Sequence, residues 1–262
     1  MGSPLATNVE VHEELGSTQQ RARELARAGA PHGTFVVSKV QTGGRGRLGR
    51  RWGSPAGGLW MSLVLRPRLS TEVAARITQT AAVGAAKTLR ELEVEARIKW
   101  PNDLLVNGRK ICGILAEASV ESVPVAAKKV GAEGGRRVDF VVLGIGLNAN
   151  LDPEDLRVPE GDGATLRCEL GRDADLLALL GSLLSHLDFE LGRIDDFAAI
   201  LDDWRALDCT LGKRVRVRRF GETLEGVALD LGPEGALLLQ TRDGVVGLFE
   251  GEIEQLRCQR SP

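Results

Sequence analysis

The stretch QTGGRGRLGRRWGSPAGG, residues 41–58, interleaves glycines with Arg45, Arg47, Arg50 and Arg51 and contains no carboxylate. Glycine lets backbone amides approach a ligand closely, and each guanidinium offers planar donors to phosphate or carboxylate oxygens. The stretch lacks the GK[ST] signature of a Walker A loop. These residue types predict an anion-binding loop that orders over its ligand, with a solvated surface loop as the alternative.

A second group of reactive side chains lies in RIKWPNDLLVNGRKICGIL, residues 97–115. Pro101 cannot donate a hydrogen bond to a β-ladder, so we expect a strand to break there. Asn107-Gly108 predicts a two-residue hairpin turn, because a type I′ turn needs positive φ at both central residues.

This turn would pair Leu105 with Lys110 and make Asp103 a diagonal neighbour of Lys110. The register places Asp103, Leu105, Lys110 and Cys112 on one face of the hairpin. One cation and one carboxylate are therefore expected to meet near the break, either in a site or as an exposed ion pair. GIGLNAN, residues 144–150, ends another predicted strand in glycines and amides, which fits either a ligand contact or a turn.

The elements around these motifs predict an α+β fold with helices on one face of a mixed, mostly antiparallel sheet. Ser17 followed by Gln20 is a capping-box pattern, and it opens a helix that stops near Gly29. Strands are expected at 34–40, 58–67 and 138–148. Further helices are expected from Thr71 to Leu92, at 173–191 and at 195–207, with a polar connector at 121–137.

After Leu211 the pattern changes to short alternating strands, which predict a small barrel-like β-domain. We therefore expect a main domain at 1–210 and a C-terminal β-domain at 211–262.

Composition limits the function classes. The chain has 262 residues with 34 basic and 36 acidic side chains, so its surface as a whole is not expected to coat nucleic acid or an anionic membrane. Its longest uncharged runs are too short for a membrane span, and the start lacks an apolar signal core. The four cysteines show no metal-ligand spacing, which predicts reduced thiols in a cytoplasmic protein.

Taken together and in order, GRGRLGRRW (44–52), KWPNDLLVNGRKICGIL (99–115) and GIGLNAN (144–150) resemble the motifs of the biotin–protein ligases, also called biotin–[acetyl-CoA-carboxylase] ligases. The resemblance implies a class II synthetase-like catalytic domain and an SH3-like C-terminal domain. It implies an ATP- and Mg²⁺-dependent ligase that forms biotinyl-5′-AMP and pyrophosphate. The biotinyl group would then pass to a lysine of the biotin carboxyl carrier domain of a biotin-dependent carboxylase.

The resemblance also implies roles for single residues, without a direct metal motif. The catalytic residues would be Lys110, Arg45 and Asp103. The biotin-binding residues would be Ser17, Thr18, Gln19, Gln41, Gly43, Arg45, Gly46, Arg47, Lys110 and Gly113. The ATP- or adenylate-binding residues would be Arg45, Arg47, Arg50, Trp52, Asn102, Asp103 and Asn148.

Some positions depart from the family. Gln19 stands where asparagine is frequent, Leu48 where some members carry another arginine, and Cys112 where a small residue is common; we expect an inert thiol there. The first ligase motif arrives at Ser17, which predicts a ligase without the DNA-binding domain of bifunctional members. We expect no DNA or membrane partner and a monomer or weak homodimer.

Three alternatives stay open at this point, one of which is an adaptor whose C-terminal β-domain binds peptides. A lipoate–protein ligase shares the core fold and the acyl-adenylate chemistry, but it is expected to lack the GRGRxGRxW loop. A nucleic-acid-binding protein could use the glycine/arginine stretch as an RGG-like contact, but it predicts more aromatic residues and wider basicity than this chain has.

Overall fold

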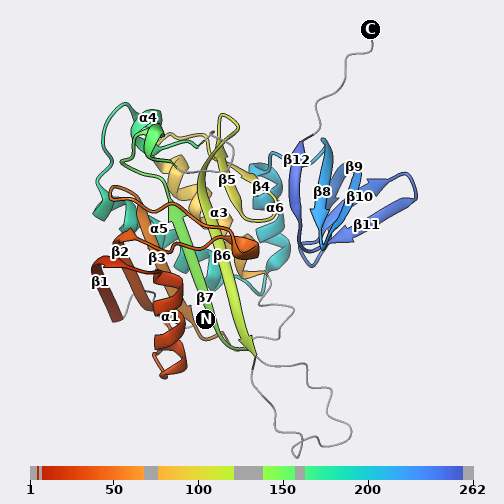
Figure 1. Ribbon diagram of the computed structural model, residues 1–262. Coiled ribbons are helices and arrows are strands. Elements are labelled where there is room, and N and C mark those ends of the chain that lie inside the picture. The colour runs from red at the N-terminus through yellow and green to blue at the C-terminus, as the bar shows by residue number, and fades with distance from the viewer. Residues whose placement is uncertain (1–4, 6–7, 68–75, 121–137, 157–162, 256–262) are drawn as a thin grey trace, which may run out of the picture.

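The computed structural model describes residues 5, 8–67, 76–120, 138–156 and 163–255 (Figure 1). A seven-stranded sheet has the order β1-β2-β3-β7-β6-β5-β4. Its strands are β1 Asn8–Leu15, β2 Thr34–Gln41, β3 Leu59–Leu65, β4 Arg97–Lys99, β5 Asp103–Val106, β6 Arg109–Val120 and β7 Val138–Leu147. The β1–β2 pair is parallel and the other pairs are antiparallel, which confirms the predicted mixed, mostly antiparallel α+β fold.

Helices α3 Ile77–Glu91, α5 Leu176–Gly192 and α6 Phe197–Leu207 build the main core on one face of this sheet. Helix α1, Thr18–Arg27, is the exception, because it packs on the opposite face against Val36, Val64 and Val142 (Figure 1). Both faces of β3 are buried, so this strand is a continuous apolar run that can bury helices on either side. The short helix α4 spans Leu166–Leu170.

Near the start of the chain, the predicted helix cap is confirmed, but one strand was not predicted. Ser17 caps α1 by accepting a hydrogen bond from the backbone N–H of Gln20, as predicted, and Gly29 follows the helix end with φ of 90°. Strand β1 was not expected, because Val9 and Val11 are exposed on an edge strand and give no buried alternation. The predicted connector at 121–137 and the start of the helix expected from Thr71 lie outside the described residues.

The second sheet is antiparallel and five-stranded, with the order β11-β10-β9-β8-β12. Its strands are β8 Arg214–Arg219, β9 Glu222–Leu231, β10 Leu237–Thr241, β11 Gly244–Leu248 and β12 Glu252–Gln255. The buried Trp100 next to β4 contacts this second sheet, since its indole N–H donates to the carbonyl of Gly235, between β9 and β10, at 3.5 Å. A division at 210/211 stays a prediction. Among the described helices, none combines the length and apolarity needed to cross a bilayer.

Candidate active site

A cavity of about 440 Å³ opens on the face of the seven-stranded sheet that carries α1. This volume lies in the range of small-molecule sites. The predicted site residues that line it are Ser17, Thr18, Gln19, Gln41, Arg45, Gly46, Arg47, Arg50, Trp52, Asn102, Asp103, Lys110, Gly113 and Asn148. Gly43 is the exception: its N–H donates to the Gly16 carbonyl at 2.7 Å and ties the loop to the turn before α1. The structure therefore brings the predicted residues together around one space, while their individual roles stay predictions.

Glycines form the floor of this cavity. Gly113 on β6 and Gly146 on β7 are paired across the sheet. The indole of Trp52 lies on them, since a Cβ at Gly146 would be 2.5 Å from Trp52 Nε1 and one at Gly113 would be 3.0 Å from its Cζ3. Trp52 Nε1 is buried and has no hydrogen-bond partner among the described residues. The floor thus accepts a flat group at van der Waals distance from the backbone.

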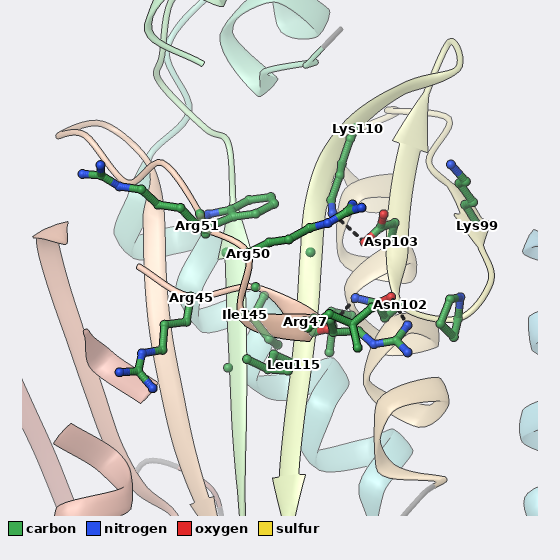
Figure 2. Close-up of a pocket in the computed structure, with 18 of the residues that line it drawn as sticks. Arg45, Arg47, Arg50, Arg51, Lys99, Asn102, Asp103, Lys110, Leu115 and Ile145 are labelled. Carbon is green, nitrogen blue, oxygen red and sulfur yellow. Dashed lines mark hydrogen bonds and ion pairs between the residues drawn. The ribbon is translucent and has the colours of Figure 1, made fainter. Parts of the chain in front are cut away.

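Lys110 and Asp103 meet at one end of the floor. Lys110 Nζ lies 2.7 Å from Asp103 Oδ1 and 4.9 Å from the centroid of the Trp52 ring (Figure 2). The hairpin turn has the predicted geometry, with φ of 51° at Asn107 and 77° at Gly108. The predicted approach of this cation and this carboxylate is confirmed.

The prediction that Cys112 shares their face is wrong. A bulge shifts the register between Leu104 and Leu105, so that Lys110 pairs with Leu105 but Cys112 pairs with Leu104. One extra residue on β6 turns Cys112 toward the helix side. There it is buried, and burial raises the pKa of its thiol to about 12. An inert thiol at this position is the expected consequence.

The glycine/arginine loop folds back on itself above the floor. The Trp52 N–H donates to the Gly44 carbonyl at 2.9 Å, and the Gly46 N–H donates to the Arg50 carbonyl at 2.8 Å. Gly44 has to be glycine, because a Cβ would lie 2.5 Å from the Trp52 carbonyl oxygen. The short helix η1, Arg47–Gly49, forms the tip of the loop.

The arginines of the loop divide into two groups (Figure 2). Arg47 points toward the hairpin and donates from Nη1 to Asn102 Oδ1 at 3.0 Å; burial lowers the pKa of its guanidinium, and the charge of Asp103 opposes this shift. Arg50 also points toward the hairpin and forms an ion pair with Glu252 of the second sheet. Arg45 and Arg51 are exposed and direct their guanidinium groups away from Lys110. Arg47 and Arg50 therefore point toward the hairpin that carries Lys110, whereas Arg45 lines the same cavity with its guanidinium directed away from Lys110.

The other end of the floor is polar and uncharged. Gln41 Oε1 accepts from the Thr18 N–H at 2.8 Å, and Gln41 Nε2 donates to Ser54 Oγ at 2.8 Å. Thr18 Oγ1 lies 2.9 Å from Ser62 Oγ, and Ser62 contacts the side chain of Gln19. Sequence reasoning missed Ser62, although a single serine inside the fully buried strand LWMSLVL is a usable signal.

Two further contributions appear only in three dimensions. Arg218, Glu252 and other residues of the second sheet line the cavity, although the sequence assigned this domain no site residue. Asn148 donates from Nδ2 to the carbonyls of Lys110, at 3.3 Å, and Ala164, at 3.1 Å, and so fixes the backbone behind Lys110. A contact of Asn148 with a nucleotide stays a prediction.

Comparison with known proteins gives consistent matches. Residues 12–133 match the biotin/lipoate A/B protein ligase family, and residues 210–255 match the biotin protein ligase C terminal domain. The bifunctional ligase/repressor BirA of Bacillus subtilis is 37% identical over 250 residues, which cover 93% of this chain and 72% of that protein. The biotin–[acetyl-CoA-carboxylase] ligase of Paracoccus denitrificans is 32% identical over 232 residues, covering 86% and 90%. The structure of the biotin protein ligase from Aquifex aeolicus in complex with biotin and ATP has a TM-score of 0.76 at 26% identity, covering 96% of this chain and 99% of that one.

Proposed function

The chain belongs to the biotin–protein ligase family, and we propose that it activates biotin with ATP in the cavity of its larger sheet and passes the biotinyl group to a lysine of a carboxylase. In the first step the biotin carboxylate attacks the α-phosphorus of ATP, giving biotinyl-5′-AMP and pyrophosphate. In the second, a lysine amine attacks the acyl carbon, forming an amide and releasing AMP and a proton.

One observation carries this proposal: the cavity is polar and uncharged at one end, apolar and flat in the middle, and cationic at the other end. Thr18 and Gln41 form the polar end, the glycine floor with the Trp52 indole on it forms the middle, and Lys110 with Arg47 forms the cationic end. Biotin has the same order, with a cyclic urea, an apolar ring and arm, and a carboxylate. Gly144 lies at the polar end and Leu147, three residues further along β7, lies near the cationic end. The two ends of the cavity are therefore about 10 Å apart along the strand.

The cationic end addresses the main barrier of the first step, the repulsion between a carboxylate and a triphosphate. Positioned cations that face the developing charge stabilise such a transition state without reorganising. Lys110 holds the carboxylate, and Arg47, which is already desolvated and fixed by Asn102, faces the α-phosphate side. Arg50 can exchange Glu252 for a phosphate oxygen. The loop over the floor would also keep water from the mixed anhydride.

ATP brings Mg²⁺, which would neutralise phosphate charge when it is bound. Among the described residues there is no group of three His, Cys, Asp or Glu side chains that could hold a metal. Mg²⁺ at nucleotide sites is usually bound by the phosphates, water and one or two carboxylates. Asp103 is the carboxylate within the cavity at the hairpin, and this sparse donor set fits a metal carried by the nucleotide.

The same proposal includes a biotin carboxyl carrier domain as the acceptor, a monomer or weak homodimer, and a cytoplasmic location. The acceptor lysine has an ordinary pKa near 10.4 and must lose a proton before it attacks. The hairpin side of the cavity, where Lys99 and Asp103 are partly exposed, is the approach for this amine.

The test is incubation of the purified chain with labelled biotin, MgATP and a biotin carboxyl carrier domain, followed by mass analysis of the carrier. We expect one biotinyl group on one carrier lysine, and biotin-dependent but not lipoate-dependent exchange of pyrophosphate into ATP. Exchange supported by lipoate alone would assign the site to a lipoate ligase. No exchange with either acid would refute acyl-adenylate chemistry.

A further inference from the structure

A second, smaller hollow lies beside the cavity, where β4 and β5 meet the start of the second sheet. Its volume is about 270 Å³. The residues that line both spaces are Lys99, Leu105, Gly108 and Ile253. The two spaces are therefore neighbours on the side of the hairpin from which the acceptor amine is expected to approach.

The wall of this hollow is cationic. Arg97 and Lys99 come from β4, and Lys213 comes from the segment between α6 and β8. Among the described residues, no carboxylate lines the hollow, and Lys99 and Lys213 form no ion pair. Arg97 Nη2 lies 3.9 Å from a carboxylate oxygen of the exposed Glu95, at the limit of an ion pair. Three positive charges thus face one small space with little compensation from the chain itself.

The thiol of Cys209, which also lines the hollow, gives independent evidence that these charges converge. Burial raises the pKa of this thiol to about 11, and the charge of Asp208 adds to the rise. The charges of Lys213, Lys99 and Arg97 all oppose it. A charge affects a pKa in this way only from nearby, so the three cations surround one point.

Asp208 is a carboxylate near this point, but it does not line the hollow. It is mostly buried, and its Oδ1 accepts hydrogen bonds from the backbone N–H groups of Thr210 and Leu211. The carboxylate therefore serves the turn before β8. An anion that enters the hollow would meet the three cations and no carboxylate in the described part of its wall.

The position of the hollow favours an anion that belongs to the acceptor protein. An acceptor lysine that reaches the corner of Lys110 and Asp103 from the hairpin side has to pass Lys99. The acceptor surface around that lysine would then lie over the hollow, because Lys99 lines both spaces. Cations without a partner in the chain attract an anionic surface by a Coulomb force that added salt weakens.

We propose that Arg97, Lys99 and Lys213 form a docking site for carboxylates that the acceptor protein carries close to its target lysine. This proposal rests on the proposed function, because it takes a lysine of a carboxylase as the acceptor. The site acts in the second step only: it selects and orients the acceptor, and it takes no part in the formation of the adenylate.

Charge reversal at Lys213 tests the site, because Lys213 lines the hollow but not the larger cavity. The matched control is Arg214→Glu, which makes the same change in net charge at the next residue. Arg214 is exposed, lines neither space and forms no ion pair among the described residues.

Both variants are compared with the parent in two assays, after thermal unfolding has shown that they fold. Biotin-dependent pyrophosphate exchange without acceptor measures the first step. Transfer of biotin to a biotin carboxyl carrier domain, at several salt concentrations, measures the second step and gives the KM for the carrier domain.

We expect Lys213→Glu to raise the KM for the carrier domain about fivefold or more at low salt, and the difference should shrink as salt is added. Its pyrophosphate exchange should stay within about twofold of the parent, because the first step does not use the hollow. Arg214→Glu should change the KM for the carrier domain less than about twofold. A carrier domain whose carboxylates nearest the target lysine are changed to amides should have a raised KM with the parent, but little further increase with Lys213→Glu.

The proposal is overturned if Lys213→Glu and Arg214→Glu raise the KM for the carrier domain equally, or if neither raises it. It is also overturned if the loss of carrier carboxylates adds fully to the effect of Lys213→Glu. A loss of pyrophosphate exchange in Lys213→Glu would contradict it as well, since the hollow would then serve the nucleotide or pyrophosphate.

If Lys213→Glu fails to fold, Lys213→Gln replaces it, with a smaller increase in the KM for the carrier domain that should also disappear at high salt. Failure of the proposed function is a different result, because the parent chain itself would then show neither biotin-dependent exchange nor transfer.

Discussion

Lys110 Nζ lies 2.7 Å from Asp103 Oδ1, although neither residue is the directly paired neighbour of the other in the hairpin. The β-bulge beside Leu105 and the turn at Asn107 bring the two side chains to the same corner of the cavity. Asp103 therefore holds the ammonium group at the cationic end of the cavity. In the proposed function, a substrate carboxylate bound there would contact this ammonium group, whose nearest protein counter-charge is on the side of the hairpin.

Replacing Lys110 with alanine tests this arrangement. We expect Lys110→Ala to lower kcat/KM for biotin-dependent pyrophosphate exchange by roughly a hundredfold or more, because a preorganised cation at the reacting carboxylate is lost. The fold should persist, since the side chain is partly exposed and outside the core. The matched control is Lys39→Ala, which removes an exposed lysine paired with Glu13. A near-parental rate of pyrophosphate exchange by Lys110→Ala would contradict the proposal that this lysine binds the reacting carboxylate.

The glycine floor gives a second prediction. Gly146→Ala would place a methyl group against Trp52 Nε1 and displace the indole from the sheet. We expect Gly146→Ala to bind biotin at least about tenfold more weakly, because overpacking moves a wall of the site. We also expect the change in tryptophan emission on addition of biotin to differ from that of the parent. Gly181→Ala is the control, since Gly181 is an exposed helix residue with no atom within 4 Å of its Cβ position. Equal biotin affinity of both variants would show that the Trp52 indole on this floor is not a wall of the biotin site.

Several parts of the site could be predicted because their signals are local. The turn at Asn107-Gly108 depends on two adjacent residues, and the loop depends on glycine and arginine within one segment. Ser62, Glu117 and Glu252 could not be placed, because they reach the site only when β3, β6 and β12 meet side chains distant in sequence. Pairing across strands is specified by the whole sheet, and no single segment contains it.

The error at Cys112 has the same kind of origin. Alternation from the turn gives the correct partner for Lys110, but one bulge residue reverses the faces of everything that follows on β6. The direction of the Arg45 side chain is also set by tertiary structure, because the loop folds back through its own backbone hydrogen bonds. A resemblance to a family identifies such residues as a set. The direction in which each side chain points can be known only from the folded structure.

Cysteine labelling tests the corrected face of Cys112. Burial raises the pKa of the Cys112 thiol to about 12 and that of Cys209 to about 11, whereas Cys168 is exposed. At pH 8 we expect iodoacetamide to modify Cys168 at least about a hundredfold faster than Cys112, since the thiolate is the nucleophile. Peptide mass analysis over time gives the rates, with urea-unfolded protein as the reference. Rapid labelling of Cys112 in the folded chain would show that its thiol lies on the cavity face of the sheet.

An ion-pair cluster behind the sheet predicts how stability depends on pH. Burial disfavours the charged form of Asp203, but hydrogen bonds from Lys87 and Arg193 outweigh this and lower the pKa of its carboxyl below the ordinary 3.8. A carboxyl with a lowered pKa stabilises the fold above its unfolded pKa, and this stabilisation is lost as the pH falls through the folded value.

We therefore expect Asp203→Asn to lower the free energy of unfolding at pH 7 by about 1–2 kcal/mol, a value reduced for its partial exposure. The deficit should shrink as the pH falls below 3.8, where the parent loses the same charge. Asp202→Asn, next in sequence and exposed, is the control and should cost less than about 1 kcal/mol. Urea unfolding at several pH values measures both. A deficit that is independent of pH would contradict the ionic origin.

Replacing Arg47 tests directly whether the glycine/arginine loop closes over the bound adenylate. Its guanidinium is half-buried, bonded to Asn102 and directed at the hairpin, so it joins the loop to the cationic end. We expect Arg47→Gly to weaken retention of biotinyl-AMP by roughly tenfold or more, through loss of a charge-assisted contact and a more flexible loop. The released anhydride should then biotinylate bystander proteins. Arg51→Gly makes the same substitution in the same loop, but its guanidinium points away from the hairpin, so retention should be near parental. Both variants are compared by mass analysis of an added non-substrate protein and by the dissociation rate of labelled adenylate. Equal leakage of adenylate from the two variants would show that the loop closes the site without Arg47.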